Sequence, residues 1–132
     1  MRHSALTLLC FWLAACATTH KPLPPQPSVY VVAFPRASLA ISQRAAAVIN
    51  SIAADANRHR TLIVQVTGPP TKKQPGYNPG LAAPRMVAVE RALIAAGVDR
   101  NRIIRNIAAP EMVAELAGGQ EIQIRVVEKP VS

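Results

Sequence analysis

Four short apolar segments along the chain have the composition and alternation of β-strands. They cover residues 29–34, 62–67, 102–108 and 121–128. The first is rich in β-branched and aromatic residues and ends at Pro35. In the second, alternate apolar residues share one face until Gly68-Pro69-Pro70 interrupts the pattern. The fourth has apolar residues at every second position, so it also predicts a strand with one buried face.

Two longer segments have the three- and four-residue spacing of amphipathic helices. Apolar residues recur at that spacing from Ile41 to His59 and again from Ala83 to Ala96. Gly97 follows the second segment, where a left-handed helix cap is expected. A short helical turn is also expected between Glu111 and Ala117. The order strand, helix, strand, helix, strand, strand predicts an α/β two-layer sandwich, with two helices packed on one mixed sheet.

The N-terminus has the pattern of a bacterial lipoprotein signal peptide. Met1 to His3 is a short basic region, an apolar run follows, and Leu13-Ala14-Ala15-Cys16 closes it. The peptidase for such signals cuts before a cysteine that already carries diacylglycerol. We therefore expect residues 1–15 to be removed and Cys16 to be lipidated. Ordinary secretion and a spanning anchor are the alternatives, but Ala5 to Ala17 has 13 residues, against roughly 20 that cross a bilayer.

Residues 16–28 are expected to form a tether between the lipid and the folded domain. Four prolines in this short segment favour an extended polyproline II chain. Such a chain could span on the order of 35 Å, at about 3.1 Å per residue. The folded domain is expected to cover residues 29–130.

The charge of the chain indicates an anionic partner. Removal of Arg2 with the signal peptide would leave fourteen basic and seven acidic residues, a net charge of +7. Lipid headgroups and peptide carboxylates fit this balance. Nucleic acid is not expected, because single-strand binders stack bases on several aromatic residues and only three would remain in the mature chain. A solvated basic surface is the simpler alternative.

No residue pattern indicates an enzyme. His3 lies in the signal peptide, His20 in the tether, and His59 at a helix end, where a histidine complements the helix dipole. Cys10 would leave with the signal peptide and Cys16 would carry the lipid. The sequence also lacks a glycine-rich phosphate loop and a pair of histidines on one helix face. We therefore expect no catalytic residue, no metal site and no cofactor.

The segment from Tyr77 to Val89 resembles a known family. It contains Asn78, then Leu81-Ala82, then Arg85-Met86 and a valine. This is similar to the pattern of the OmpA-like domain: Asn, two residues, Leu-Ser, two residues, Arg-Ala, then Val. That family is the periplasmic module that anchors Gram-negative outer membranes to peptidoglycan. The resemblance extends over about Val29 to Glu128 and implies the βαβαββ fold of OmpA-like domains.

The resemblance also implies a ligand site for diaminopimelate of the peptidoglycan stem peptide. In the family, an aspartate after the second strand binds the ammonium group, and an arginine at the helix start binds the carboxylate through paired N–H donors. Arg85 matches this arginine. Tyr77 and Asn78 belong to the same motif, and Lys72 and Lys73 precede it, so all four are candidate contacts for a peptide carboxylate. For Tyr77 the alternative role is to cover the loop against the sheet.

The sequence departs from the family pattern at several positions. The family aspartate aligns with Pro70 or Thr71, and no acidic residue occurs from Val66 to Val89. Gly119-Gln120-Glu121 stands where the family has an arginine pair, and Ala82 replaces the helix-capping serine. Removing one charged partner from a recognition site typically costs about 2–5 kcal/mol. The resemblance therefore implies a site that keeps its carboxylate half, has lost its ammonium half, and binds more weakly.

Two functions stay open from the sequence alone. One is a lipid-anchored outer-membrane protein whose periplasmic domain makes weakened, non-covalent contact with peptidoglycan. The other is a structural subunit of an envelope assembly, such as a secretion or conjugation channel, that binds a protein partner instead. Ala17 after the cysteine resembles the enterobacterial signal for delivery to the outer membrane. Whether Arg85 meets a ligand or pairs with Glu90 or Asp99 is also open.

Overall fold

The computed structural model describes residues 28–72, 79–109, 112 and 120–129. Its elements, in chain order, are β1 (Ser28–Ala33), α1 (Gln43–Arg58), β2 (Leu62–Gly68), α2 (Ala82–Ala95), the 3₁₀ turn η1 (Arg100–Arg102), β3 (Ile103–Ile107) and β4 (Glu121–Glu128). The predicted order of strands and helices is confirmed. The helical turn expected at 111–117 lies outside the described residues, except for Met112.

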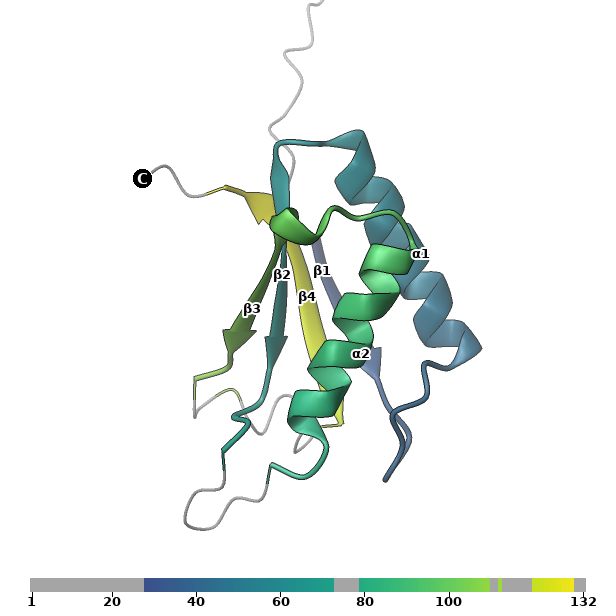
Figure 1. The fold of residues 1–132 in the computed structure, drawn as a ribbon, viewed down its shortest axis with the longest axis vertical. Coiled ribbons are helices and arrows are strands. Elements are labelled where there is room, and N and C mark those ends of the chain that lie inside the picture. The colour runs from purple at the N-terminus through teal and green to yellow at the C-terminus, as the bar shows by residue number, and fades with distance from the viewer. Residues whose placement is uncertain (1–27, 73–78, 110–111, 113–119, 130–132) are drawn as a thin grey trace, which may run out of the picture.

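The four strands form one mixed sheet in the order β1-β4-β2-β3 (Figure 1). Strand β4 is antiparallel to both β1 and β2, while β2 and β3 are parallel. Ser28 pairs with Val126, and Val64 pairs with both Val126 and Ile103. The start of β1, the start of β2, the start of β3 and the end of β4 therefore lie together.

This register defines which strand ends lie together at each of the two opposite ends of the sheet. We call the end where β1 begins, at Ser28, the tether end, because the expected tether joins the domain there. The opposite end, where β1 ends at Ala33 and β2 ends at Gly68, is the loop end. Helix α2 starts at the loop end and runs toward the tether end (Figure 1).

Both helices cover the same face of the sheet and enclose one core (Figure 1). The apolar stripes predicted from the spacing of the helices are buried, and they meet the alternate apolar residues of the strands. The least exposed large side chains of this core include Val32, Ile49, Ile52, Val64, Val66, Val89, Leu93, Ile122 and Ile124. The α/β two-layer sandwich predicted from the sequence is therefore confirmed.

The helix ends differ in how their backbone groups are satisfied. At the start of α1, the Ser42 hydroxyl accepts a hydrogen bond from the Ala45 amide at 3.1 Å. The N-cap of α2 is Leu81, whose side chain makes no capping bond. At the end of α2, Gly97 adopts a φ of 98° and the Val98 amide donates to the Leu93 carbonyl, so the predicted left-handed cap is confirmed.

The third strand is one residue shorter at each end than predicted. Its expected first residue, Arg102, ends η1 instead. The Asp99 carboxylate accepts a hydrogen bond from the Asn101 amide at 2.9 Å and so starts the 3₁₀ turn. Because this turn occupies Arg100 to Arg102, the extended backbone begins only at Ile103.

Arg102 ties the tether end together through its side chain. Its guanidinium donates to three backbone carbonyls, those of Ala56, His59 and Leu62, at 2.6 to 3.0 Å. Ala56 belongs to the last turn of α1, where carbonyls lack helical partners and the dipole favours a cation. One side chain thus connects the end of α1, the following turn and the start of β2.

Candidate functional site

Arg85 lies in the first turn of α2, at the loop end of the domain. Within the described ranges it is the only charged residue that is buried, with 5% of its surface exposed. Its Nε donates to the Ser38 carbonyl at 3.1 Å, and its Nη2 donates to the Pro35 carbonyl at 3.0 Å. Its Cζ also lies 5.3 Å from the centre of the Phe34 ring, which allows a cation–π interaction. The guanidinium is therefore bound to the segment that joins β1 to α1.

The segment that Arg85 binds is a tight turn. The Ser38 amide donates to the Pro35 carbonyl at 3.2 Å, which closes the turn. Ala37, inside it, has a φ of 54°, a left-handed conformation that side-chain-bearing residues rarely adopt. Arg85 donates to the carbonyls at both ends of this turn. It thereby stabilises a backbone conformation that the local sequence alone does not favour.

The end of β2 approaches α2 closely beside Arg85. A Cβ atom at Gly68 would lie 2.5 Å from Met86 Sδ, so only glycine fits there without displacing the methionine. Pro70 is buried, while Thr71 is exposed. These two residues are the candidates for the position of the family aspartate. Neither supplies a carboxylate to the site.

Solved structures identify this arrangement, although no protein-family model and no curated protein matches the sequence. The OmpA-like domain of FopA1 from Francisella tularensis subsp. tularensis SCHU S4 is similar with a TM-score of 0.58, at 15% identity, over 79% of this chain and 77% of that one. This chain has the OmpA-like fold.

Two further structures with this similarity come from other bacteria. The peptidoglycan-associated lipoprotein from Burkholderia pseudomallei has a TM-score of 0.54 at 20% identity, over 75% of this chain and 89% of that chain. The C-terminal domain of Helicobacter pylori MotB has a TM-score of 0.55 at 21% identity, over 76% and 85%. At these identities the similarity establishes the OmpA-like fold, while the chemistry of the site rests on this chain's own residues.

The other predicted site residues of the OmpA-like domain fall mostly outside the described part. Lys72 is described and exposed, four residues beyond the end of β2. Lys73, Tyr77 and Asn78 lie outside the described residues, as does Cys16. The structure therefore brings Arg85 together with the β1–α1 turn, and the contacts proposed for the other four residues stay predictions.

The two acidic residues that could have paired with Arg85 have other partners. Glu90 forms an ion pair with Arg105, with 3.3 Å between Oε2 and Nε, and its Oε1 lies 3.9 Å from Arg100 Nε. Asp99 accepts from the Asn101 amide. The actual partners of Arg85 could not be predicted from the sequence, because backbone carbonyls occur at every residue and leave no signal in a sequence.

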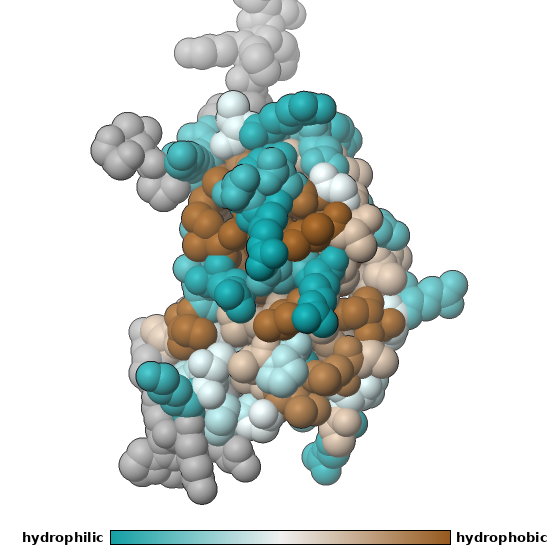
Figure 2. Space-filling model, viewed as in Figure 1, coloured by the Kyte–Doolittle hydropathy of each residue, from teal (hydrophilic) through white to brown (hydrophobic). Residues whose placement is uncertain are grey.

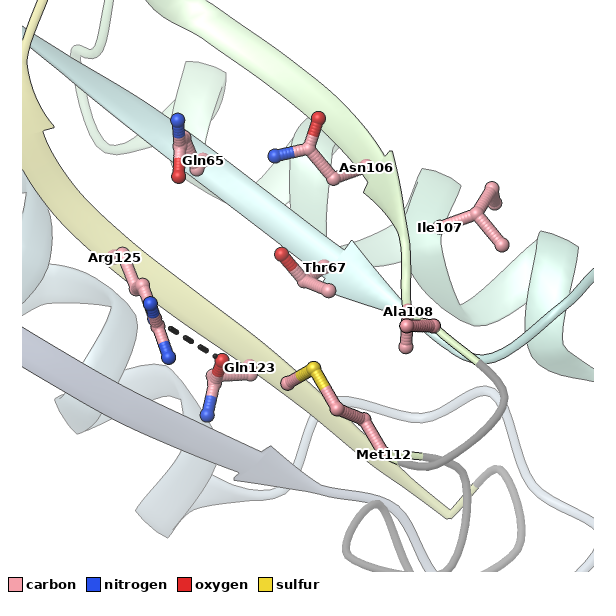
Figure 3. A pocket seen from close by; sticks show the side chains of 9 residues that line it. Gln65, Thr67, Asn106, Ile107, Ala108, Met112, Gln123 and Arg125 are labelled. Atoms are coloured by element: carbon pink, nitrogen blue, oxygen red, sulfur yellow. Dashed lines mark hydrogen bonds between the residues drawn. The ribbon is translucent and has the colours of Figure 1, made fainter.

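The face of the OmpA-like sheet opposite the helices has a polar hollow of about 350 Å³. Figure 3 shows Gln65 and Thr67 of β2, Asn106 of β3, and Gln123 and Arg125 of β4 along it. Arg125 Nε donates to Gln123 Oε1 at 3.2 Å. Carboxamides and hydroxyls can both donate and accept hydrogen bonds. No helix of the described part covers this face, which accounts for its polar composition.

Two further findings apply to the described residues. Their His, Cys, Asp and Glu side chains form no group of three that could hold a metal ion. Their helices are also too short or too polar to cross a membrane.

Proposed function

We propose that this chain is a lipid-anchored lipoprotein of the outer membrane, with its OmpA-like domain in the periplasm. In this proposal, Cys16 carries the lipid and the domain makes weakened, non-covalent contact with peptidoglycan. The observation that carries the proposal is the OmpA-like fold, because one protein with this fold is named a peptidoglycan-associated lipoprotein. The lipoprotein-type N-terminus before the domain supports the same conclusion.

The surroundings of Arg85 support a weak contact. A carboxylate ligand would compete with the Pro35 and Ser38 carbonyls for its N–H donors. The exposed Lys72 and its neighbour Lys73 are better placed in the sequence to meet a stem-peptide carboxylate, together with Tyr77 and Asn78. Arg85 then acts as a positioning residue that holds the loop end of the domain in shape.

The hydrogen bonds of Arg85 also favour a second candidate function. If the arginine serves only to hold the β1–α1 turn, the domain keeps the OmpA-like fold without its ligand. It would then be a structural or accessory subunit of an envelope assembly, of the secretion or conjugation type.

Sedimentation with purified peptidoglycan sacculi separates these two functions. We expect the detergent-solubilised lipoprotein to sediment weakly with sacculi, and a Lys72→Gln/Lys73→Gln variant to lose most of this binding. The matched control is Arg44→Gln/Arg60→Gln, which removes the same charge from two exposed residues of the described part. Equal loss in both variants would indicate non-specific charge attraction. A chain that never sediments, but is recovered from the envelope in a large complex, supports the structural role.

The lipid anchor has its own test. A Cys16→Ser variant is expected to lose metabolic labelling with palmitate and to keep its signal peptide, because the peptidase requires a lipidated cysteine. Cys10→Ser serves as the control and should be labelled and processed normally. Labelling that persists in Cys16→Ser would show that the lipidation site lies elsewhere.

A further inference from the structure

Three arginines line a hollow on the outer side of α2 and β3. The hollow has a volume of about 250 Å³ and lies away from Arg85. Its lining consists of Arg91, Arg100 and Arg105, together with Glu90, Val87 and Ile94. Two apolar side chains and three guanidinium groups around one carboxylate leave a net charge of +2 at this place.

Glu90 orients two of these arginines without neutralising the hollow. It contacts Arg105 and Arg100 through their Nε atoms, at 3.3 and 3.9 Å. The glutamate side chain is 13% exposed, whereas the side chains of Arg100 and Arg105 are 78% and 54% exposed. A guanidinium held at Nε still has its terminal N–H donors, which form the fork that binds carboxylate or phosphate oxygens.

Arg91 adds a third cation to the hollow. In residues 28–72, 79–109, 112 and 120–129, its side chain takes part in no hydrogen bond or ion pair. It precedes Ile94 by one helical turn, on the exposed side of α2. A dianion or a cluster of anionic groups therefore suits the hollow better than a single neutral ligand.

The hollow lies toward the tether end of the domain. Glu90, Arg91 and Ile94 belong to the half of α2 nearer that end, and Arg100 lies in η1, directly before β3. Figure 2 shows hydrophilic side chains in the upper half of the helix-covered face, the half toward the tether end, with hydrophobic side chains on either side of them. Arg58, Arg60 and Lys129, all exposed, lie at the same end.

We propose that Arg91, Arg100 and Arg105 bind the phosphate groups of an anionic phospholipid surface. The choice of a membrane as the partner rests on the lipid anchor of the proposed function. Eleven residues lie between Cys16 and Ser28. A tether of that length holds the tether end within about 35 Å of the bilayer. Docking through the arginines would direct the opposite end, with Arg85 and Lys72, away from the membrane and toward the cell wall.

A single fluorescent label tests this docking. The two cysteines of the chain would be removed with the signal peptide or lipidated, so Ile94→Cys supplies one thiol in the hollow for an environment-sensitive dye. The labelled lipoprotein is reconstituted into vesicles of phosphatidylcholine, with or without phosphatidylglycerol. We expect a blue-shifted emission only when phosphatidylglycerol is present and only at low salt. The same dye at Thr71→Cys, at the loop end, should show no shift.

Charge variants identify the residues responsible. Arg91→Gln/Arg100→Gln leaves the shorter Glu90–Arg105 ion pair intact. It should lower the ratio of docked to undocked protein about 25-fold, because each arginine contributes a factor of about 5. Arg36→Gln/Arg44→Gln removes the same charge from exposed residues elsewhere and should leave docking unchanged. No shift on phosphatidylglycerol vesicles, or an equal loss in both variants, would overturn the proposal.

Two further experiments are needed. One distinguishes soluble phosphate from lipid phosphate as the ligand, and the other distinguishes failure of the lipid anchor from failure of the docking. A shift caused by inorganic phosphate in micelles, without one on phosphatidylglycerol vesicles, would assign the hollow to a soluble anion and refute membrane docking. Flotation with pure phosphatidylcholine vesicles reports the anchor alone, so a chain that does not float refutes the lipidation. That unlipidated chain is then tested by flotation with phosphatidylglycerol vesicles. If the docking proposal holds, this flotation still requires the three arginines.

Discussion

Replacing Arg85 with alanine is expected to lower the free energy of unfolding by about 3 kcal/mol. The substitution leaves the Pro35 and Ser38 carbonyls without their charged donor and opens a space between α2 and the Phe34 ring. Urea denaturation of the purified lipoprotein, followed by circular dichroism, measures this loss. Arg85→Lys keeps the charge but cannot reach both carbonyls with a planar fork, so an intermediate loss is expected.

The matched control for Arg85 lies in the turn that it binds. Arg36 is exposed, and its replacement by alanine should change stability by less than about 0.5 kcal/mol. If Arg85→Ala were as stable as the wild type, the arginine would not be needed to hold the turn, and its role as a ligand-binding residue would gain support. Sacculus binding by an Arg85 variant is interpretable only beside this stability measurement.

The second large effect is expected at Arg102. Arg102→Ala should lower the free energy of unfolding by about 2 kcal/mol, because the Ala56, His59 and Leu62 carbonyls lose a common charged donor near a helix C-terminus. For a domain of this size the melting temperature should decrease by roughly 10 °C. Hydrogen exchange should also increase in the last turn of α1, where the contact is made.

Arg100 is the control for this prediction. It lies two residues before Arg102 in the same 3₁₀ turn and is exposed, and within the described part of the chain its side chain makes only the 3.9 Å ion pair with Glu90. Arg100→Ala should therefore change the melting temperature little. A decrease as large as that of Arg102→Ala would mean that η1 itself, and not the carbonyl contacts of Arg102, stabilises the tether end.

Both predictions concern arginines whose importance in this fold depends on backbone acceptors. For Arg85 the stability measurement alone does not decide between the two candidate functions. An arginine that is essential for stability and dispensable for sacculus binding is expected in both the weakened contact and the structural role. The lysine pair at 72 and 73 then distinguishes them, since only peptidoglycan contact depends on those charges.

The sequence by itself determined the secondary structure of the described residues to within a residue or two at most boundaries. Strand β4 covers Glu121–Glu128 as predicted, and the left-handed cap at Gly97 was also predicted. These features depend on local patterns: alternation with period two, helical spacing, and glycine or proline at the ends. Local backbone preference and one-sided burial are visible in neighbouring residues, which explains why they could be read in one dimension.

Only the tertiary structure decided the strand order β1-β4-β2-β3 and the partners of the two arginines. The Arg85 contacts join residues 47 and 50 positions apart, and the Arg102 contacts join residues 40 to 46 positions apart. For a side chain that needs a carboxylate partner, the sequence offers few candidate partners, because acidic residues are few. For a side chain that binds backbone carbonyls it does not, because every residue has one and only the fold brings a particular carbonyl within reach.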